Sequence, residues 1–287
     1  MRQSVDPFAC HPNLKDKILD PLQSFWRGFD PHEFMASQPQ GTMTLDNIYS
    51  LEERETNRLN VLSGRFDQDL YIFAYGSLMW DPGFVFSEVR RAHLKNYQRR
   101  FILKDTAGAR GSEEQPGLMA ALDVGDYCEG MLFKIAPADI EKESDILWRR
   151  EMVAPAYKPA FVDVEAQGQH FSALTFVADH SAEMICGDLT WQQQTEYAAT
   201  GVGFLGSSLD YLTNIARQFE TLGIVDKHVN ELLAATKAYL AVARSKWLTG
   251  APVIAQINSP YSCGDTEDGS ACFRSLSSEP ISPTWAL

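Results

Sequence analysis

The chain has no long hydrophobic run and no excess of basic residues. None of the apolar runs in its 287 residues approaches the length of about 20 that a membrane-spanning helix needs. The net charge is −13, and a nucleic-acid partner is disfavoured because neutralising phosphates requires a basic face. The first residues show no hydrophobic stretch typical of a secretory signal, so we expect a cytoplasmic protein without a membrane partner.

The sequence also lacks the usual motifs for metal binding and for an activated serine. Its five cysteines are scattered and form no CxxC pair, which favours a reduced protein. His170 and His180 lie outside any HExxH arrangement, and no GxSxG motif is present. A Cys–His nucleophile stays open, although nothing around Cys128 or Cys186 marks an activated thiol. We therefore expect neither a metal nor a cofactor.

Hydrophobic residues make up 45% of the chain, enough for a full core, and their pattern predicts strands early and helices late. This order indicates an α+β domain with a mostly antiparallel or mixed sheet. The predicted strands are 71–75, 84–94, 96–103, 118–124, 127–135, 157–164 and 171–178. The predicted helices are 138–150, 190–200, a helix capped by Ser207 or Ser208 that ends at Gly223, and 226–247.

The composition divides the chain into three parts. Residues 1–68 contain several prolines, and we interpret them as an extension that packs on the main domain through aromatic residues. The alternative is an arm that docks a protein partner. Within the extension, the spacing predicts a short amphipathic helix over 22–29 and a second helix over 46–62 capped by Asp46. The main domain is predicted over 69–249, and 250–287 is expected to be a loose tail.

The segment 71–80 combines a buried strand with a sharp turn. Aromatic and β-branched residues predict the strand, and Gly76 then lets the backbone bend and present its N–H groups. Such a turn can direct donors at an anion or at a developing oxyanion. The alternative is an ordinary strand that ends in a tight turn.

Two further patterns have both a functional and a structural interpretation. Glu151 follows Arg149 and Arg150 at a helix end, where it is either a buried acid with a shifted pKa or part of a solvated terminus. The glycines of 201–206 match GxGxxG. However, a helix is predicted before them, where a dinucleotide-binding motif needs a strand, so we favour a simple loop between helices.

Taken in order along residues 69–245, several segments resemble the ChaC-type γ-glutamylcyclotransferases. A departure is Asp210, where the family usually has Glu, and both termini have no counterpart in compact family members. The resemblance therefore leaves regulation and partners more open than chemistry. The similar segments are 73–80 (FAYGSLMW), 96–101 (NYQRRF), the pairs RG and PG at 110–111 and 116–117, 148–151 (WRRE), 210–212 (DYL) and 222–226 (LGIVD).

The resemblance implies a γ-glutamylcyclotransferase-like fold, a small mixed barrel with flanking helices. It also implies cleavage of glutathione to 5-oxoproline and Cys-Gly, with Glu151 as general acid and base and without metal or cofactor. The substrate-binding residues that it implies are Tyr75, Gly76, Ser77, Leu78, Tyr211 and Arg110.

Two alternatives stay open beside this function. One is a cyclotransferase for another γ-glutamyl compound, since specificity depends on the surfaces that surround the substrate. The other is a non-catalytic binding or regulatory module on the same fold, with the extension as the possible contact for a protein partner. The presence of Gly76, Ser77 and Glu151 together favours the enzyme.

Overall fold

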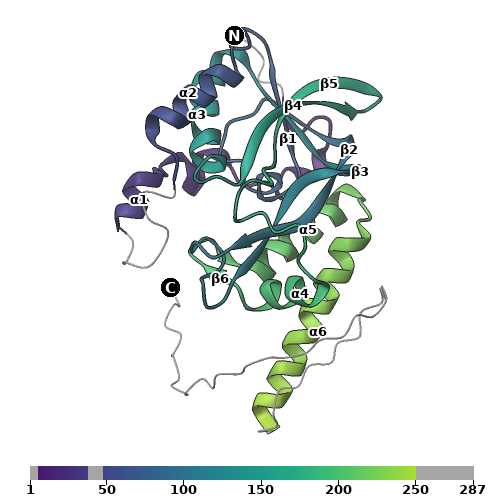
Figure 1. Cartoon of the computed structure of the whole chain (residues 1–287). Helices are drawn as coiled ribbons and strands as arrows, with labels where there is room; N and C mark the ends of the chain where they lie inside the picture. Colours follow the sequence, from purple (N-terminus) through teal and green to yellow (C-terminus); the bar gives the residue numbers. More distant parts are fainter. Residues whose placement is uncertain (1–5, 38–47, 250–287) are drawn as a thin grey trace. The chain divides into compact units, whose positions relative to one another are not determined.

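A computed structural model describes residues 6–37 and 48–249, with side chains described as far as residue 245. At its centre a five-stranded sheet closes into a barrel in the order β1-β3-β2-β4-β5 (Figure 1). Strand β5 runs parallel to β1, and the other pairs of adjacent strands in this order are antiparallel. The predicted α+β fold with a mixed sheet and a small barrel is thus confirmed. The barrel strands are β1 (Leu70–Ala74), β2 (Glu88–Asp105), β3 (Gly117–Ile135), β4 (Tyr157–Ala166) and β5 (Gln169–Ala178).

Strands β2 and β3 are each one long strand, where the sequence pattern predicted two. Their pairing shifts register between Lys95 and Tyr97, where one residue of β2, Asn96 with φ 65°, lies opposite two residues of β3, Gly125 and Asp126. Asparagine tolerates this left-handed conformation, and the extra residue of β3 forms a bulge that bends the paired strands without ending them. The interruption in the apolar pattern therefore reflects a bend within one strand.

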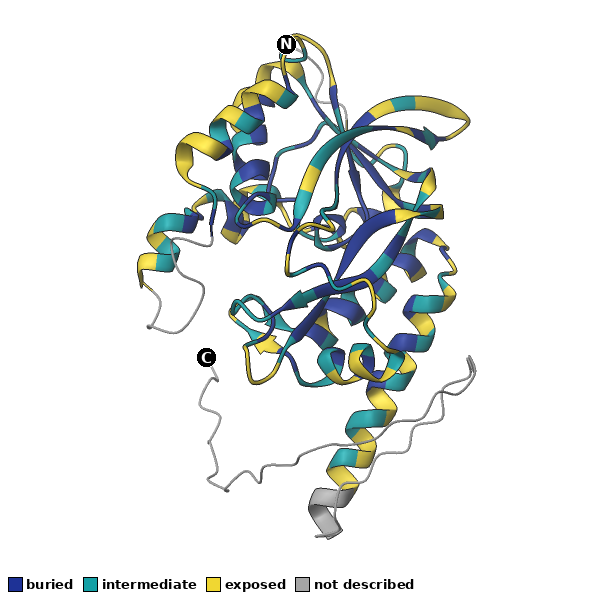
Figure 2. Cartoon of the chain, in the orientation of Figure 1, coloured by how far each residue is buried: buried dark blue, intermediate teal, exposed yellow. Residues whose placement is uncertain are grey.

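The later helices form one group that packs against the barrel. Helices α4, α5 and α6 contact one another, and α4 and α5 contact β3 (Figure 1). Figure 2 shows buried residues concentrated in the barrel strands and on the inner faces of these helices. The helices are α1 (Pro31–Ser37), α2 (Leu51–Val61), α3 (Ile140–Glu151), α4 (Trp191–Thr200), α5 (Ser208–Leu222) and α6 (Lys227–Thr249).

The helix ends follow local hydrogen-bonding rules. The Ser207 hydroxyl accepts from the Asp210 N–H and caps α5, which ends at Gly223 with φ 65°, as predicted. Helix α2 begins later than predicted, because Ser50 and Glu53 form a reciprocal capping box. The proposed cap Asp46 lies outside the described residues.

The helix predicted over residues 22–29 is wrong. This segment forms two separate single turns of 3₁₀-helix, η2 (Pro21–Gln23) and η3 (Phe25–Arg27). The Ser24 hydroxyl accepts from the Trp26 N–H, which starts a new turn and prevents a continuous helix.

Residues before β1 contribute to the main hydrophobic core. Leu14 and Ile18 are buried in the same cluster as Phe84 and Phe133. The Leu19 N–H also donates to the carbonyl oxygen of Trp80 at 2.8 Å. The division at residue 68 stays a prediction, and the expected tail over 250–287 lies outside the described residues.

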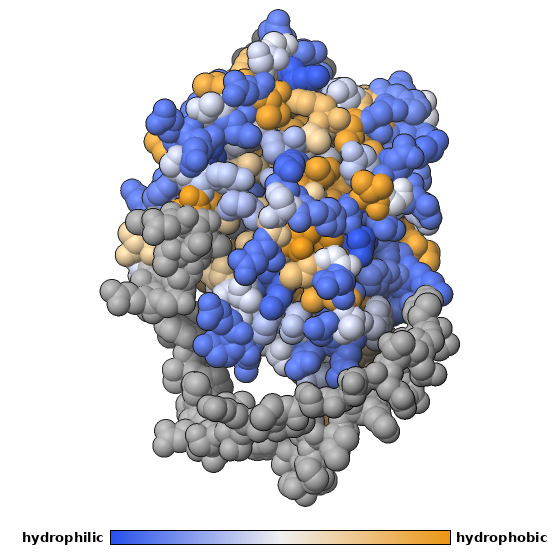
Figure 3. All heavy atoms as spheres, viewed as in Figure 1, coloured by the Kyte–Doolittle hydropathy of each residue, from blue (hydrophilic) through white to orange (hydrophobic). Residues whose placement is uncertain are grey.

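Within the described ranges, no helix is long and apolar enough to cross a membrane. On the face drawn in Figure 3, hydrophobic residues lie in small patches between hydrophilic ones.

The glycine-rich stretch 201–206 joins α4 to α5 and lies against the loop between β2 and β3. It contains the short strands β6 (Val202–Gly203) and β7 (Gly206–Ser207). The Phe204 N–H donates to the Gly108 carbonyl at 3.0 Å, and the Leu205 N–H donates to Ala109 at 2.9 Å. As expected, a helix and not a strand precedes the glycines. They serve close approach of two backbones rather than phosphate binding.

We expect Gly203→Ala to destabilise the protein. A Cβ at this position would lie 2.2 Å from the carbonyl oxygen of Gly108, so one of the two backbones must move. Such overpacking typically costs about 1–3 kcal/mol of unfolding free energy. Thermal unfolding should therefore show a lower Tm than for Gly28→Ala, a control where the added Cβ meets nothing within 4 Å. Equal melting temperatures for the two variants would contradict this role.

Candidate active site

Glu151 is the last residue of α3 and lies at the edge of the core. The helix buries an apolar face that includes Ile140, Leu147 and Trp148, and this packing fixes its C-terminal turn beside the barrel. The Glu151 side chain is 15% exposed. It is therefore held by the core and still reachable from a cavity.

Arg150 is the partner of the Glu151 carboxylate. Its Nε lies 3.0 Å from Glu151 Oε1, its Nη2 donates to the Ser77 hydroxyl at 2.8 Å, and its Nη1 donates to the Asp81 carbonyl. Burial raises the pKa of Glu151, while the charge and hydrogen bond of Arg150 lower it, and the net shift is upward. Glu151 is thus a stronger base than an ordinary exposed carboxylate.

Two adjoining cavities meet at Glu151. The inner cavity, of about 30 Å³, is lined mainly by aromatic side chains and by the turn after β1. Six of the seven residues that the sequence indicated lie on its surface. Its lining is Phe73, Tyr75, Gly76, Ser77, Leu78, Ala120, Glu151, Tyr157, Phe176 and Tyr211.

The turn after β1 lines this inner cavity and has backbone donors that are unpaired within the described ranges. Ser77, Leu78 and Met79 form the 3₁₀ turn η5 (Ser77–Met79), which follows Gly76 directly. Among the described residues, no protein group accepts from the N–H groups of Gly76, Ser77 and Leu78. Unpaired N–H groups at such a turn can bind an anion, and this function of the turn stays a prediction.

Two tyrosines hold the walls of the inner cavity in place. The Tyr75 hydroxyl donates to the Phe176 carbonyl at 2.8 Å, and Arg99 Nε donates to the Tyr75 carbonyl at 2.7 Å. The Tyr211 hydroxyl accepts from the Ala120 N–H at 3.2 Å. Burial raises the pKa of both phenols, so they are neutral hydrogen-bonding groups at neutral pH.

Arg110 is the one predicted residue that lies outside both linings. Its guanidinium carbon is 4.9 Å from the centroid of the Tyr211 ring, and its Nη1 donates to the Ser207 carbonyl at 3.1 Å. Burial lowers the pKa of this side chain. Arg110 therefore packs against Tyr211 and the start of α5.

Sequence reasoning did not assign Tyr157, which lines both cavities. It is the first residue of β4, and its hydroxyl donates to the Ala120 carbonyl at 3.3 Å. Burial raises its pKa well above the ordinary value. The sequence offered one signal for Tyr157, its position at the start of the strand that follows the helix of Glu151. That signal does not assign the residue to the site without the tertiary contacts.

The outer cavity has a volume of about 150 Å³ and is lined largely by apolar side chains. It shares Ser77, Glu151, Tyr157 and Tyr211 with the inner cavity. Ala107 and Ala109 of the loop between β2 and β3 lie on it. Its remaining lining residues are Trp26, Phe29, Met35, Leu103, Asp105, Met119, Arg150, Val153, Ala154, Ala156, Met184, Phe204 and Leu205.

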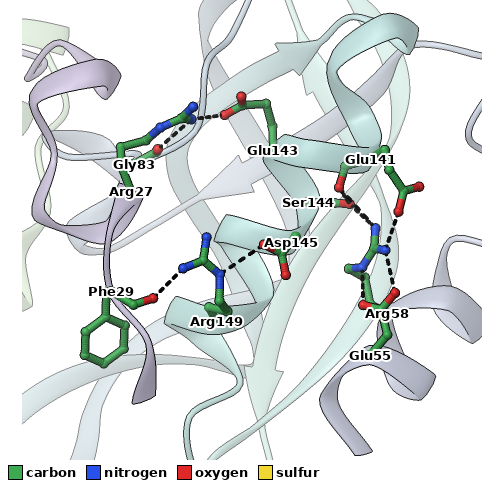
Figure 4. A network of polar contacts seen from close by, with 10 residues as sticks. All are labelled: Arg27, Phe29, Glu55, Arg58, Gly83, Glu141, Glu143, Ser144, Asp145 and Arg149. Carbon is green, nitrogen blue, oxygen red and sulfur yellow. Dashed lines mark hydrogen bonds and ion pairs between the residues drawn. The ribbon is translucent and has the colours of Figure 1, made fainter. Parts of the chain in front are cut away.

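Polar contacts attach the N-terminal segments to α3 (Figure 4). Arg27 binds Glu143, and Arg149 Nη1 donates to the Phe29 carbonyl. On the other side of the helix, Arg58 donates to Glu141 at 2.7 Å and to the Ser144 hydroxyl at 2.8 Å. These contacts fix the helix that ends in Glu151 from two sides.

The described residues contain no group of three or more His, Cys, Asp or Glu side chains arranged to hold a metal ion.

Comparison with known proteins identifies the family. The model of the family described as ChaC-like protein matches residues 70–239. The chain belongs to the ChaC-like family. The glutathione-specific gamma-glutamylcyclotransferase of Escherichia coli K12 is 33% identical over 196 residues, which cover 68% of this chain and 84% of the relative. The human glutathione-specific gamma-glutamylcyclotransferase 1 is 29% identical over 180 residues, which cover 60% of this chain and 81% of the relative.

A solved structure shares the ChaC-like fold. The yeast gamma-glutamylcyclotransferase specific to glutathione superposes with a TM-score of 0.54 at 18% identity, over 60% of this chain and 97% of that one. The family match starts at the first residue of β1. In this ChaC-like chain, Trp26, Phe29 and Met35 of the outer cavity therefore precede the residues that the family model matches.

Proposed function

We propose that this protein cleaves glutathione to 5-oxoproline and Cys-Gly, with Glu151 as the general base and acid. The observation that carries the proposal is the position of Glu151, whose raised pKa suits proton transfer, on the same inner cavity as the turn after β1, whose N–H groups have no acceptor among the described residues. The names of the Escherichia coli and human relatives support glutathione as the substrate.

The reaction is an internal ring closure. The α-amine of the γ-glutamyl group gives a proton to the Glu151 carboxylate, and its nitrogen forms a bond with the γ-carbonyl carbon. The bond from that carbon to the cysteine nitrogen then breaks, and Glu151 returns the proton to the leaving nitrogen. Holding the glutamyl chain curled in a small cavity supplies much of the rate, since the attack is intramolecular.

The other site residues bind and orient the glutamyl group in this proposal. The N–H groups of Gly76, Ser77 and Leu78 donate to its α-carboxylate or to the developing oxyanion. Tyr75, Tyr157 and Tyr211 surround the ring that forms. Arg110 acts through Tyr211, because its guanidinium packs on that ring rather than on the cavity.

Product formation from several γ-glutamyl substrates tests this proposal. Purified protein should release 5-oxoproline from glutathione far faster than from glutamine, because binding energy from the Cys-Gly portion helps to hold the cyclising conformation. Preference for γ-glutamyl-alanine would instead indicate a cyclotransferase for another γ-glutamyl compound. No 5-oxoproline from any of these substrates would support the non-catalytic alternative.

The pH dependence should report the ionisation of Glu151. Only the carboxylate form accepts the proton, so kcat/KM falls as the pH drops through the pKa of Glu151. Burial places that pKa above the ordinary value of 4.5. In Arg150→Gln the acid limb, the fall of kcat/KM at low pH, should move to higher pH, because Arg150 lowers the pKa of Glu151.

Arg149→Gln is the matched control for this pH profile. Arg149 lies on the same helix but contacts Asp145 and the Phe29 carbonyl instead of Glu151. Its acid limb should coincide with that of the wild type. An acid limb that stays in place in Arg150→Gln would show that the limb does not report Glu151.

A further inference from the structure

We infer that the outer cavity is a subsite for an apolar group on the leaving portion of the substrate, and that aromatic residues of the N-terminal extension set this preference. The inference rests on the proposed function and adds a substrate class to it. That class is γ-glutamyl compounds whose second residue has a bulky apolar side chain. It includes glutathione conjugates in which the cysteine sulfur carries an apolar group.

The cavity offers apolar surface and no available cation. Among the described residues that line it, Arg150 is the one with a cationic side chain, and it is already bound to Glu151, Ser77 and Asp81. The Asp105 carboxylate accepts from the N–H groups of Ala107 and Arg110. Most other lining side chains are aliphatic, aromatic or thioether groups, so the surface favours an apolar substituent.

The size of the cavity exceeds what a cysteine thiol needs. An apolar cavity of about 150 Å³ in another protein is large enough to bind benzene. The outer cavity has a comparable volume and lies directly against Glu151. Met35, Met119 and Met184 contribute flexible, polarisable side chains, which adapt to substituents of different shape.

The aromatic residues that close this cavity come from two distant segments. Trp26 and Phe29 are buried, with ring centroids 5.0 Å apart, and Phe29 packs on Phe34 at 5.5 Å. Phe34 in turn lies 4.4 Å from Phe204 of the glycine-rich stretch. Since residues 26–35 precede the match to the family, we assign this surface to the extension of this protein.

A series of S-substituted glutathiones tests the inference. With the wild type, kcat/KM for 5-oxoproline release should rise from glutathione through S-methylglutathione to S-propylglutathione, roughly fourfold per buried methylene. S-benzylglutathione should be cleaved at least as efficiently as glutathione. Phe29→Ala should reduce the ratio of kcat/KM for S-benzylglutathione to kcat/KM for glutathione by about tenfold or more, because it removes apolar contact area from the subsite.

Two further variants complete the design. Phe204→Ala should lower the same ratio, and its side chain is 42% exposed, so it tests the subsite even if Phe29→Ala fails to fold. Phe25→Ala is the matched control. Phe25 contacts Trp26 and Phe29 in the same aromatic cluster, is 50% exposed and does not line the cavity, so the ratio should stay unchanged.

The outcomes separate this inference from the proposed function. Cleavage of glutathione together with a kcat/KM for S-benzylglutathione tenfold lower would overturn the apolar subsite and leave the proposed function intact. The same holds if both alanine variants keep the wild-type ratio. Absence of 5-oxoproline from glutathione and from every conjugate would overturn both.

Discussion

Replacing Glu151 by glutamine is expected to lower kcat by roughly 10²- to 10⁴-fold, the usual contribution of a positioned general base. The amide has nearly the same size and still forms hydrogen bonds with Arg150, but it cannot accept the proton of the substrate amine. The measurement is 5-oxoproline release from glutathione at saturating concentration, together with circular dichroism and thermal unfolding to verify the fold.

Asp145→Asn is the control for this variant. Asp145 lies on the same helix with a side chain that is 49% exposed, and it forms its ion pair with Arg149. It should therefore keep wild-type activity. If Glu151→Gln retained most of the 5-oxoproline production, another group would have to act as the base.

The same variant gives a stability signal with a defined sign. The pKa of Glu151 is raised in the folded protein, so folding favours its protonated form. Its contribution to the free energy of unfolding is present below the unfolded pKa and is lost as the pH rises through the folded pKa. The Tm of Glu151→Gln relative to that of the wild type should therefore increase as the pH rises from the ordinary value of 4.5 through the raised pKa of Glu151.

Gly76→Ala is expected to reduce kcat/KM at least tenfold. A Cβ at position 76 would lie 2.9 Å from the Tyr211 hydroxyl oxygen, closer than real contacts of this kind. Either Tyr211 moves and loses the hydrogen bond from the Ala120 N–H, or the turn that presents the backbone donors moves. Each of these changes alters the inner cavity, and displacements of about 1 Å can cost 10²-fold in rate.

A double-mutant cycle with Tyr211→Phe tests this cause. Removing the hydroxyl makes room for the new Cβ, so Gly76→Ala should cost less in the Tyr211→Phe background than in the wild type. Strict multiplication of the two single effects would show that the clash with Tyr211 is not the reason. Wild-type kcat/KM and Tm in Gly76→Ala would remove this turn from the mechanism.

Local sequence determined most of the inner cavity. The run of aromatic and β-branched residues over β1 predicts a buried strand, and Gly76 and Ser77 immediately mark its turn. Glu151 ends a helix whose apolar spacing and proline start are visible in the sequence. The family resemblance then connected these segments, which lie about 75 residues apart in the chain, and the structure places them on one cavity.

Local sequence also determined the type of most elements but not the continuity of the strands. Both β2 and β3 were predicted as pairs of shorter strands, because a bulge interrupts the alternation that identifies a strand. Whether such an interruption ends a strand depends on whether a partner continues to pair beyond it. The pairing partner is remote in the chain, so the local residue pattern does not show whether pairing continues.

Only the tertiary structure decided the outer cavity. The aromatic residues around Trp26 and Phe29 indicated a packed extension or a docking arm, but nothing local indicated that they face Glu151, more than 100 residues later. Tyr157 and Gly203 likewise acquire their functions from contacts with distant backbone at Ala120 and Gly108. Residue type and spacing determine which surfaces are buried, whereas the choice of which surfaces meet follows from the closure of the barrel and the packing of all segments together.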